Sequence, residues 1–239
     1  MGKIEDTEVK LLHYTPLEIA DIAISKCYDK ESYTEYEKQK KRINNVANVS
    51  KHSSTIEHLE YNLDIVGISR ACLEQLARHR LFSFTVKSTR YTLQELKNEE
   101  PFCSYRIIDK EGKDNLEIYG TYEQKERASK YIYLTDVNST DTKSISALEL
   151  LRQEIIDGTK RDVAKYCLPE CYKTSLTLTG NARVLQNFLS LRTDSHALLE
   201  IQKLAHKIYE VLPDEHKFLF EDYVKDIKEN KQDKQIKED

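Results

Sequence analysis

The sequence predicts a single α/β domain in which a few strands alternate with amphipathic helices. Three segments indicate strands, at residues 59–65, 104–108 and 172–179, and the stretches between them place apolar residues at helical spacing. No internal repeat or linker divides the chain, and only 6 Gly and 4 Pro occur in 239 residues. We therefore expect one domain over residues 1–239.

The first quarter of the chain predicts two helices and a strand. The run Thr15-Pro16-Leu17-Glu18 is typical of a capping box, so a helix is expected from there to about Cys27. A weaker helix should follow over residues 35–49. Residues 59–65 alternate apolar and polar side chains, which indicates a half-buried strand that ends at Gly67.

The middle of the chain contains the densest group of polar side chains. Ser69 is placed to cap a helix that ends in Arg78-His79-Arg80, with an apolar stripe that includes Cys72 and Leu76. Residues 81–91 have neither a helical nor a strand period, so we expect a loop there. The next elements are expected to be a strand, an insertion loop and a charged helix, at residues 104–108, 109–115 and about 117–134.

The last third predicts mainly helices. Residues 142–165 should form one or two helices broken near Gly158, and the strand at 172–179 should lead through Gly180-Asn181 into another helix. Asp194 is placed to cap a long helix that ends near Leu212. A final amphipathic helix should start at Pro213-Asp214 and reach Ile227, and the charged tail at about 228–239 should fray.

The overall composition narrows the class of protein. The chain has 37 Lys+Arg against 41 Asp+Glu, a net charge of −4, and no apolar run that approaches the roughly 20 residues that span a bilayer. Its five cysteines show no disulfide or metal-ligand spacing. We expect a cytoplasmic protein that does not bind a membrane.

One local cluster departs from this mildly acidic background. Arg78, His79, Arg80, Lys87 and Arg90 lie within thirteen positions, interleaved with hydroxyl and aromatic side chains. Guanidinium groups, hydroxyls and turn amides are the usual ligands of phosphate. Taken singly, the arginines could be ordinary cations at a helix C-terminus. An RNA-binding surface is disfavoured by the net charge, so we expect a phosphorylated small molecule and no nucleic acid.

The order of the residues in this cluster carries a resemblance. The hallmark motif of the flavin-dependent thymidylate synthases resembles Arg78-His79-Arg80 followed, after seven residues, by Ser88 and then Arg90-Tyr91. Its upstream His-x-Ser/Thr-x-x-Glu-His element is similar to residues 52–58. Its C-terminal Asn-x-Arg, Asn-Phe-Leu-x-Leu-Arg and Asp-x-x-His-Ala run is similar to residues that start at Asn181. Three motifs in order, over about residues 10–212, make the resemblance specific.

This resemblance implies a fold, a reaction and an assembly. The fold would be a small, mostly antiparallel sheet flanked by helices. The reaction would be reductive methylation of deoxyuridylate (dUMP) to thymidylate (dTMP), with methylenetetrahydrofolate as carbon donor and NADPH-reduced FAD as hydride donor. It would need no cysteine nucleophile, and no cysteine here follows a proline. The assembly would be a homotetramer with active sites shared between chains.

The resemblance also assigns roles to individual residues. Arg192 would face the uracil ring and stabilise negative charge during catalysis. The residues expected to bind flavin are Ser54, Arg78, His79, Arg80, Asn181, Arg183, Asn187 and His196. The residues expected to contact dUMP are Gln75, Arg78, Ser88, Arg90, Lys165 and Arg192. No metal site is expected, because His52, His58 and Glu57 fit no standard ligand spacing.

Several positions depart from the family pattern. Thr85 and Val86 stand where the family usually has Asn-Glu, and Cys27 stands where it has serine or threonine. Lys165 stands where it has arginine, which keeps the charge but loses the bidentate fork. A catalytically impaired FAD- and nucleotide-binding protein of the same fold is therefore the alternative hypothesis.

Overall fold

A four-stranded sheet lies at the centre of the chain, which the computed structural model describes at residues 6–110, 113–119 and 121–225. The strand order is β1-β2-β6-β3, and every neighbouring pair is antiparallel, which confirms the predicted α/β class. These strands are β1 (Glu8–Tyr14), β2 (Glu60–Ser69), β3 (Ser83–Val86) and β6 (Lys173–Asn181).

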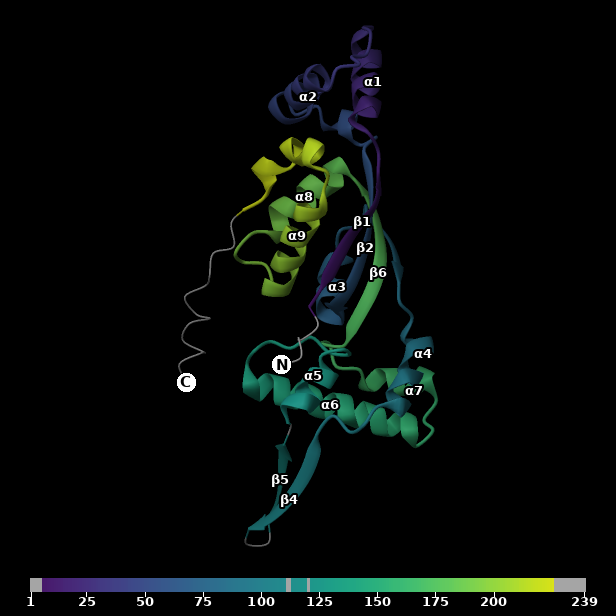
Figure 1. Cartoon of the computed structure of the whole chain (residues 1–239), viewed down its shortest axis with the longest axis vertical. Coiled ribbons are helices and arrows are strands. Elements are labelled where there is room, and N and C mark those ends of the chain that lie inside the picture. The colour runs from purple at the N-terminus through teal and green to yellow at the C-terminus, as the bar shows by residue number, and fades with distance from the viewer. Residues whose placement is uncertain (1–5, 111–112, 120, 226–239) are drawn as a thin grey trace.

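Helices cover one face of this sheet, where α3, α8 and α9 lie side by side in Figure 1. The main core lies between the sheet and these helices and includes Leu63, Ile65, Leu178, Phe188 and Ile201. The longer helices are α1 (Leu17–Tyr28), α2 (Tyr36–Asn44), α3 (Arg70–Leu76), α6 (Asn138–Ile156), α8 (Ala182–Arg192) and α9 (Leu199–Val211).

Strand β2 shows why the alternating pattern at 59–65 was informative. Tyr61, Leu63 and Ile65 are fully buried, whereas the residues between them are not, so one face of the strand enters the core. The prediction that Gly67 ends the strand was wrong. Gly67 instead takes φ +85 where the pairing with β6 shifts register, and the strand continues to Ser69. Ser69 caps α3 as predicted, since its Oγ accepts a hydrogen bond from the Cys72 N–H at 3.0 Å.

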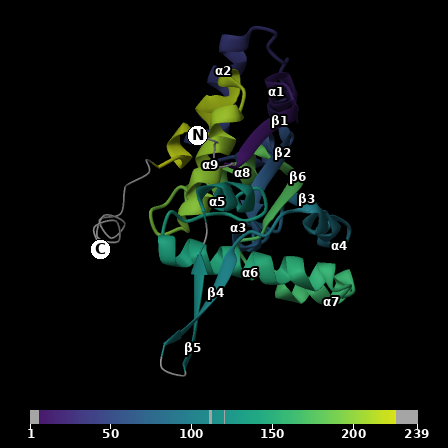
Figure 2. The ribbon, with the colours of Figure 1, turned by 60° about the horizontal axis from the view of Figure 1, so that its bottom comes forward.

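A second, smaller layer packs below the sheet. Its core includes Leu93, Phe102, Leu148 and Leu151, and α6 runs across the end of the sheet in Figure 2. A hairpin extends away from this layer in both views. The elements involved are α4 (Thr89–Thr92), β4 (Ser104–Lys110), β5 (Lys113–Tyr119), α5 (Tyr122–Ala128) and α7 (Arg161–Ala164).

Three predictions for the middle of the chain were wrong. The expected insertion loop at 109–115 lies within the β4–β5 hairpin, and the charged helix expected from about residue 117 begins only at Tyr122. The segment 81–91, expected to be a loop, contains β3, which pairs with β6. The break near Gly158 is confirmed: Gly158 takes φ +89 between α6 and α7.

Other expected helix ends were also wrong. Thr15 forms no capping box, because its hydroxyl accepts from the Glu60 N–H in β2 while Pro16 precedes α1. Asp194 does not cap a helix, since α9 begins at Leu199. The expected last helix is replaced by short 3₁₀ turns at Asp214–Leu219 and Glu221–Tyr223. Ile227 and the charged tail at 228–239 lie outside the described residues, so the domain limits of 1 and 239 stay predictions.

Candidate active site

A cleft of about 1350 Å³ opens where β6 ends and α8 begins. Its walls come from the segment after α3, from α8, from the turn after α8 and from the C-terminal segment. Many of its lining residues are polar, and they include five cationic side chains against two carboxylates. The predicted site residues among them are Arg78, His79, Arg80, Asn181, Arg183, Asn187, Arg192 and His196.

The start of α8 is fixed by a cap and a close contact. The Asn181 side-chain oxygen accepts from the Val184 N–H at 3.0 Å, so this residue is the N-cap of α8 as well as part of the cleft wall. Just before it, Gly180 lies against Phe82, and a Cβ at Gly180 would come within 2.3 Å of that ring. Only glycine lets β6 approach the segment that carries His79 and Arg80.

The end of α8 is tied to the end of α3 through Arg192. Its Nε donates to His79 Nε2 at 2.9 Å, its Nη1 to Gln75 Oε1 at 3.0 Å and its Nη2 to the Gln75 carbonyl at 3.0 Å. These three bonds fix the orientation of the guanidinium group. Two of its five N–H groups remain for a ligand.

His79 is held in its neutral form within this network. It is buried, and its ring packs edge-on against Phe188 with centroids 5.1 Å apart. Burial, and then the positive charge of Arg192, lower the pKa of His79 to about 4. Burial and the nearby Arg78 also lower the pKa of Arg192, but a guanidinium stays charged in proteins. A neutral His79 can therefore accept the Arg192 hydrogen bond at neutral pH.

The other arginines of the cleft differ in whether a carboxylate pairs with them. Arg183 forms an ion pair with Glu57, the residue after the 3₁₀ turn Ser53–Ile56. Arg78 and Arg80 are exposed and form no ion pair with any residue in the described ranges. Two uncompensated guanidinium groups at the mouth of a cleft make a site for an anion, and phosphate groups are the usual ligands.

Asp194 organises the far rim of the cleft. Its Oδ1 lies 2.7 Å from His196 Nδ1 and accepts from the His196 N–H, and its Oδ2 lies 2.7 Å from the Lys225 ammonium. The Lys225 hydrogen bond, followed by those from His196, lowers the pKa of this carboxyl well below its usual range. The rim therefore presents a fixed carboxylate between an imidazole and an ammonium.

Three residues predicted to contact the substrate lie elsewhere. Ser88 and Arg90 follow β3 at the opposite end of β6, where the Lys87 N–H donates to the Ser175 carbonyl. From Ser175 to Asn181, where the cleft begins, is roughly 20 Å of strand. Arg90 in α4 pairs with Asp162 in α7 at 2.7 Å, and Lys165 directly follows α7.

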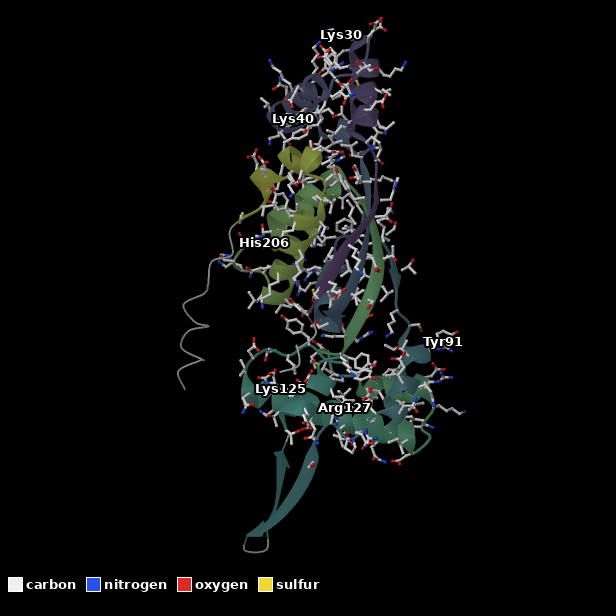
Figure 3. All side chains as sticks on the ribbon, viewed as in Figure 1. Lys30, Lys40, Tyr91, Lys125, Arg127 and His206 are labelled. Carbon is white, nitrogen blue, oxygen red and sulfur yellow. The ribbon has the colours of Figure 1, made fainter. Side chains whose placement is uncertain are left out.

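These three residues form what we call the α4–α7 group: Ser88, Arg90 and Lys165. Its surroundings are exposed, since Tyr91 is 77% exposed and Tyr166 is 83% exposed. Tyr91 belongs to α4 and lies at the outer edge of the chain in Figure 3. The chain therefore brings Gln75, Arg78 and Arg192 together, but it does not bring the α4–α7 group to them.

Sequence reasoning missed three residues that contact the site. Glu57 stands within the quoted upstream motif but was given no binding role. The sequence predicts a helix cap at Asp194 and no contact with the site, because aspartate before an apolar periodic run is the usual signal for a cap. Lys225 lies in a charged segment with no motif, so no local pattern could have found it. Ser54 is exposed in the 3₁₀ turn Ser53–Ile56 that precedes Glu57, and it does not line the cleft.

Metal binding and membrane insertion are two further functions on which the described residues bear. Among residues 6–110, 113–119 and 121–225, no group of three His, Cys, Asp or Glu side chains is placed to hold a metal ion. No helix in that part of the chain is both long enough and apolar enough to cross a membrane.

The antiparallel sheet thus ends at a cleft whose lining includes five cationic side chains, an arrangement suited to an anionic ligand. The model of a family described as "Thymidylate synthase complementing protein" matches residues 10–216. The flavin-dependent thymidylate synthase of Wolinella succinogenes is 48% identical over 214 residues, which are 89% of this chain and 96% of that protein. That of Helicobacter pylori strain 26695 is 44% identical over 221 residues, 91% of this chain and 99% of that protein.

The solved structures agree with these relatives. A crystal structure of thymidylate synthase X from Helicobacter pylori with FAD and dUMP matches with a TM-score of 0.81 and 43% identity. The match covers 92% of this chain and all of that one. The chain belongs to the flavin-dependent thymidylate synthase family.

Proposed function

We propose that this chain is a flavin-dependent thymidylate synthase that converts dUMP to dTMP. It takes the carbon from methylenetetrahydrofolate and a hydride from FAD that NADPH has reduced. The observation that carries the proposal is the Arg192–His79–Gln75 network in a cleft with two uncompensated arginines. The family to which the chain belongs, and the FAD and dUMP held by the matched Helicobacter pylori structure, support it.

The cleft residues fit FAD. At about 1350 Å³ the cleft is larger than the roughly 300–1,000 Å³ of ordinary small-ligand pockets, as a dinucleotide beside a second ligand requires. Arg78 and Arg80 supply guanidinium groups for a diphosphate, and Asn187 and His196 supply polar side chains that are exposed to a ligand. When bound, FAD supplies the hydride chemistry, so the protein needs no nucleophile of its own.

Arg192 is the residue we propose to be catalytic. Its bonds to Gln75 and His79 fix the guanidinium before a ligand arrives, and two of its N–H groups remain available. A fixed positive charge beside the uracil ring stabilises negative charge that develops on the ring, at no cost in reorganisation. Because His79 is neutral, it accepts from Arg192 and does not repel it.

The position of the α4–α7 group supports active sites shared between chains. Ser88, Arg90 and Lys165 would contact dUMP, yet they lie roughly 20 Å of strand away from the start of the cleft. The exposed Tyr91 and Tyr166 beside them are large aromatic groups of the kind that a second copy would cover. We propose a homotetramer in which the α4–α7 group of one chain completes the cleft of another.

The test follows both the cofactor and the reaction. FAD-loaded protein should lose its flavin absorbance when NADPH is added without oxygen. With methylenetetrahydrofolate present, the same protein should release tritium from ring-labelled dUMP and form dTMP. NADH in place of NADPH serves as the control for the reductant.

The outcomes separate the alternatives. A chain that binds no FAD would contradict the proposal at its first step. A chain that binds FAD and dUMP but releases no tritium would instead be the impaired binding protein, and Lys165 would then be the first departure to revert to arginine.

A further inference from the structure

The C-terminal segment at residues 221–225 includes Lys225, which lines the cleft, although the family match ends at residue 216. The Lys225 N–H donates to Thr193 Oγ1 at 3.0 Å, and that hydroxyl donates to the Leu189 carbonyl in α8. The Tyr223 ring lies 5.6 Å from the Lys51 ammonium. The segment is therefore attached to the C-terminal end of α8, whose last residue is Arg192.

This attachment places the Lys225 side chain in the cleft wall. Its ammonium bonds to Asp194 at 2.7 Å, and Asp194 bonds in turn to His196 through both the backbone N–H and the ring. Lys225 is 54% exposed in its side chain and His196 95% exposed, so Asp194, at 34%, is the least exposed member. A chain of contacts thus runs from a residue beyond the family match to a predicted flavin ligand.

The chemistry of these contacts sets what His196 can offer. An ionised carboxylate only accepts hydrogen bonds, so a neutral His196 ring that bonds to Asp194 carries its proton on Nδ1. Nε2 is then left to accept from a ligand hydroxyl or N–H. Lys225 holds Asp194 in its orientation, because removing the ammonium would leave the Asp194 Oδ2 without its partner.

We propose that Lys225 is a positioning residue of the flavin site, which holds Asp194 so that His196 presents a fixed acceptor to FAD. This inference rests on the proposed function, because it takes the cleft to be the FAD site. It adds Lys225, which lies outside the residues that the family model matches, to the flavin site. Lys225 would act through Asp194 and His196 and would not contact FAD itself.

The experiment measures FAD affinity in full-length variants by quenching of flavin fluorescence. Lys225→Gln should weaken binding about twofold to fivefold, the range expected for one partly exposed ion pair. Lys225→Arg should restore most of the affinity. The matched control is Lys217→Gln, which removes another Lys–Asp ion pair, to the exposed Asp214 at 2.6 Å, outside the cleft. It should leave affinity unchanged while it costs similar thermal stability.

A double-mutant cycle separates positioning from direct contact. If Lys225 acts through His196, adding Lys225→Gln to a His196→Ala variant should not lower the FAD affinity further. Any change should be no larger than the change that the control Lys217→Gln causes. An equal effect in both backgrounds, or a Lys225→Gln variant that matches Lys217→Gln throughout, would overturn the inference while the wild type still bound FAD. A wild-type chain that bound no FAD would overturn the proposed function, and this inference with it.

Discussion

The cleft and the α4–α7 group contain residues of one family motif, but the two regions are built in different ways. In the cleft, Arg192 is half-buried and bonded to two fixed partners, and His79 is buried. In the α4–α7 group, Arg90 is 62% exposed in its side chain and pairs with Asp162, which is 60% exposed. This difference between a preorganised half and an open half is what the proposed sharing of active sites between chains predicts.

The largest effect is expected at the fixed half. Arg192→Ala should lower kcat by about 10²–10³, the cost of removing one preorganised charge from a transition state. Arg192→Lys should recover little, because an ammonium cannot bond to both Gln75 and His79 in the same way. FAD binding should persist in both variants. Steady-state turnover with equilibrium FAD titration checks this, and an unchanged kcat in Arg192→Ala would remove Arg192 from catalysis.

The open half should affect substrate binding more than turnover. Arg90→Ala should raise the KM for dUMP roughly tenfold to 100-fold, since it removes charge-assisted bonds to the phosphate. FAD affinity should not change. The control, Asp162→Asn, breaks the Arg90 ion pair and leaves the arginine in place. Because that pair is exposed, the control should change KM by no more than about fivefold.

A third test concerns the backbone that joins the two regions. Gly180→Ala should lower the free energy of unfolding by about 1–3 kcal/mol, because its Cβ meets Phe82 in a packed interior. It should also weaken FAD binding by displacing the segment with His79 and Arg80. Gly158→Ala is the control: no atom lies within 4 Å of its Cβ, so only its positive φ is strained. Urea unfolding and FAD titration of both variants would show whether only Gly180 affects the cleft.

The last prediction is a dependence of stability on pH. Burial lowers the pKa of His79 to about 4 from an unfolded value near 6.5. The unfolded chain therefore binds more protons between these values, and stability that is complete above about pH 6.5 is lost as the pH falls. The slope due to one histidine is at most about 1.4 kcal/mol per pH unit.

A matched variant isolates this slope. His216 is also buried, with its pKa lowered to about 4 by burial, so the wild type should show both contributions. Urea unfolding of His79→Gln across this range should show a shallower pH dependence than the wild type. Equal slopes would mean that His79 is not held neutral in the folded state.

The elements predicted well are those whose signal is local. Residues 59–65 alternate because one face of β2 is buried, and Ser69 caps α3 through a hydrogen bond three residues away. The strand predicted at 104–108 is confirmed as β4, but its partner β5 was missed, because the charged residues of β5 resemble an exposed loop. Strand β3 exists because it pairs with β6, more than 90 residues later, and no pattern within four residues can show that.

The site residues also divide into those that a sequence motif identifies and those that only the folded chain reveals. Motif order identified eight of the cleft residues, but it could not show that Ser88 and Arg90 lie apart from them in one chain. Asp194 was predicted to cap a helix, but that helix starts five residues later. The Asp194 side chain bonds to His196 instead, which competes with a capping role. Lys225 contacts Asp194 across about 30 residues, so only the folded chain reveals it.

The most direct test of the account mixes two defective variants. Arg192→Ala lacks the fixed half of the site and Arg90→Ala lacks the open half, so each alone should be nearly inactive at dUMP concentrations below KM. If active sites are shared between chains, co-expressed mixed oligomers should recover a measurable share of wild-type activity, since some sites would combine an intact Arg192 with an intact Arg90. A mixture that stays as inactive as its components, although the two chains are shown to associate, would mean that each chain builds its own complete site.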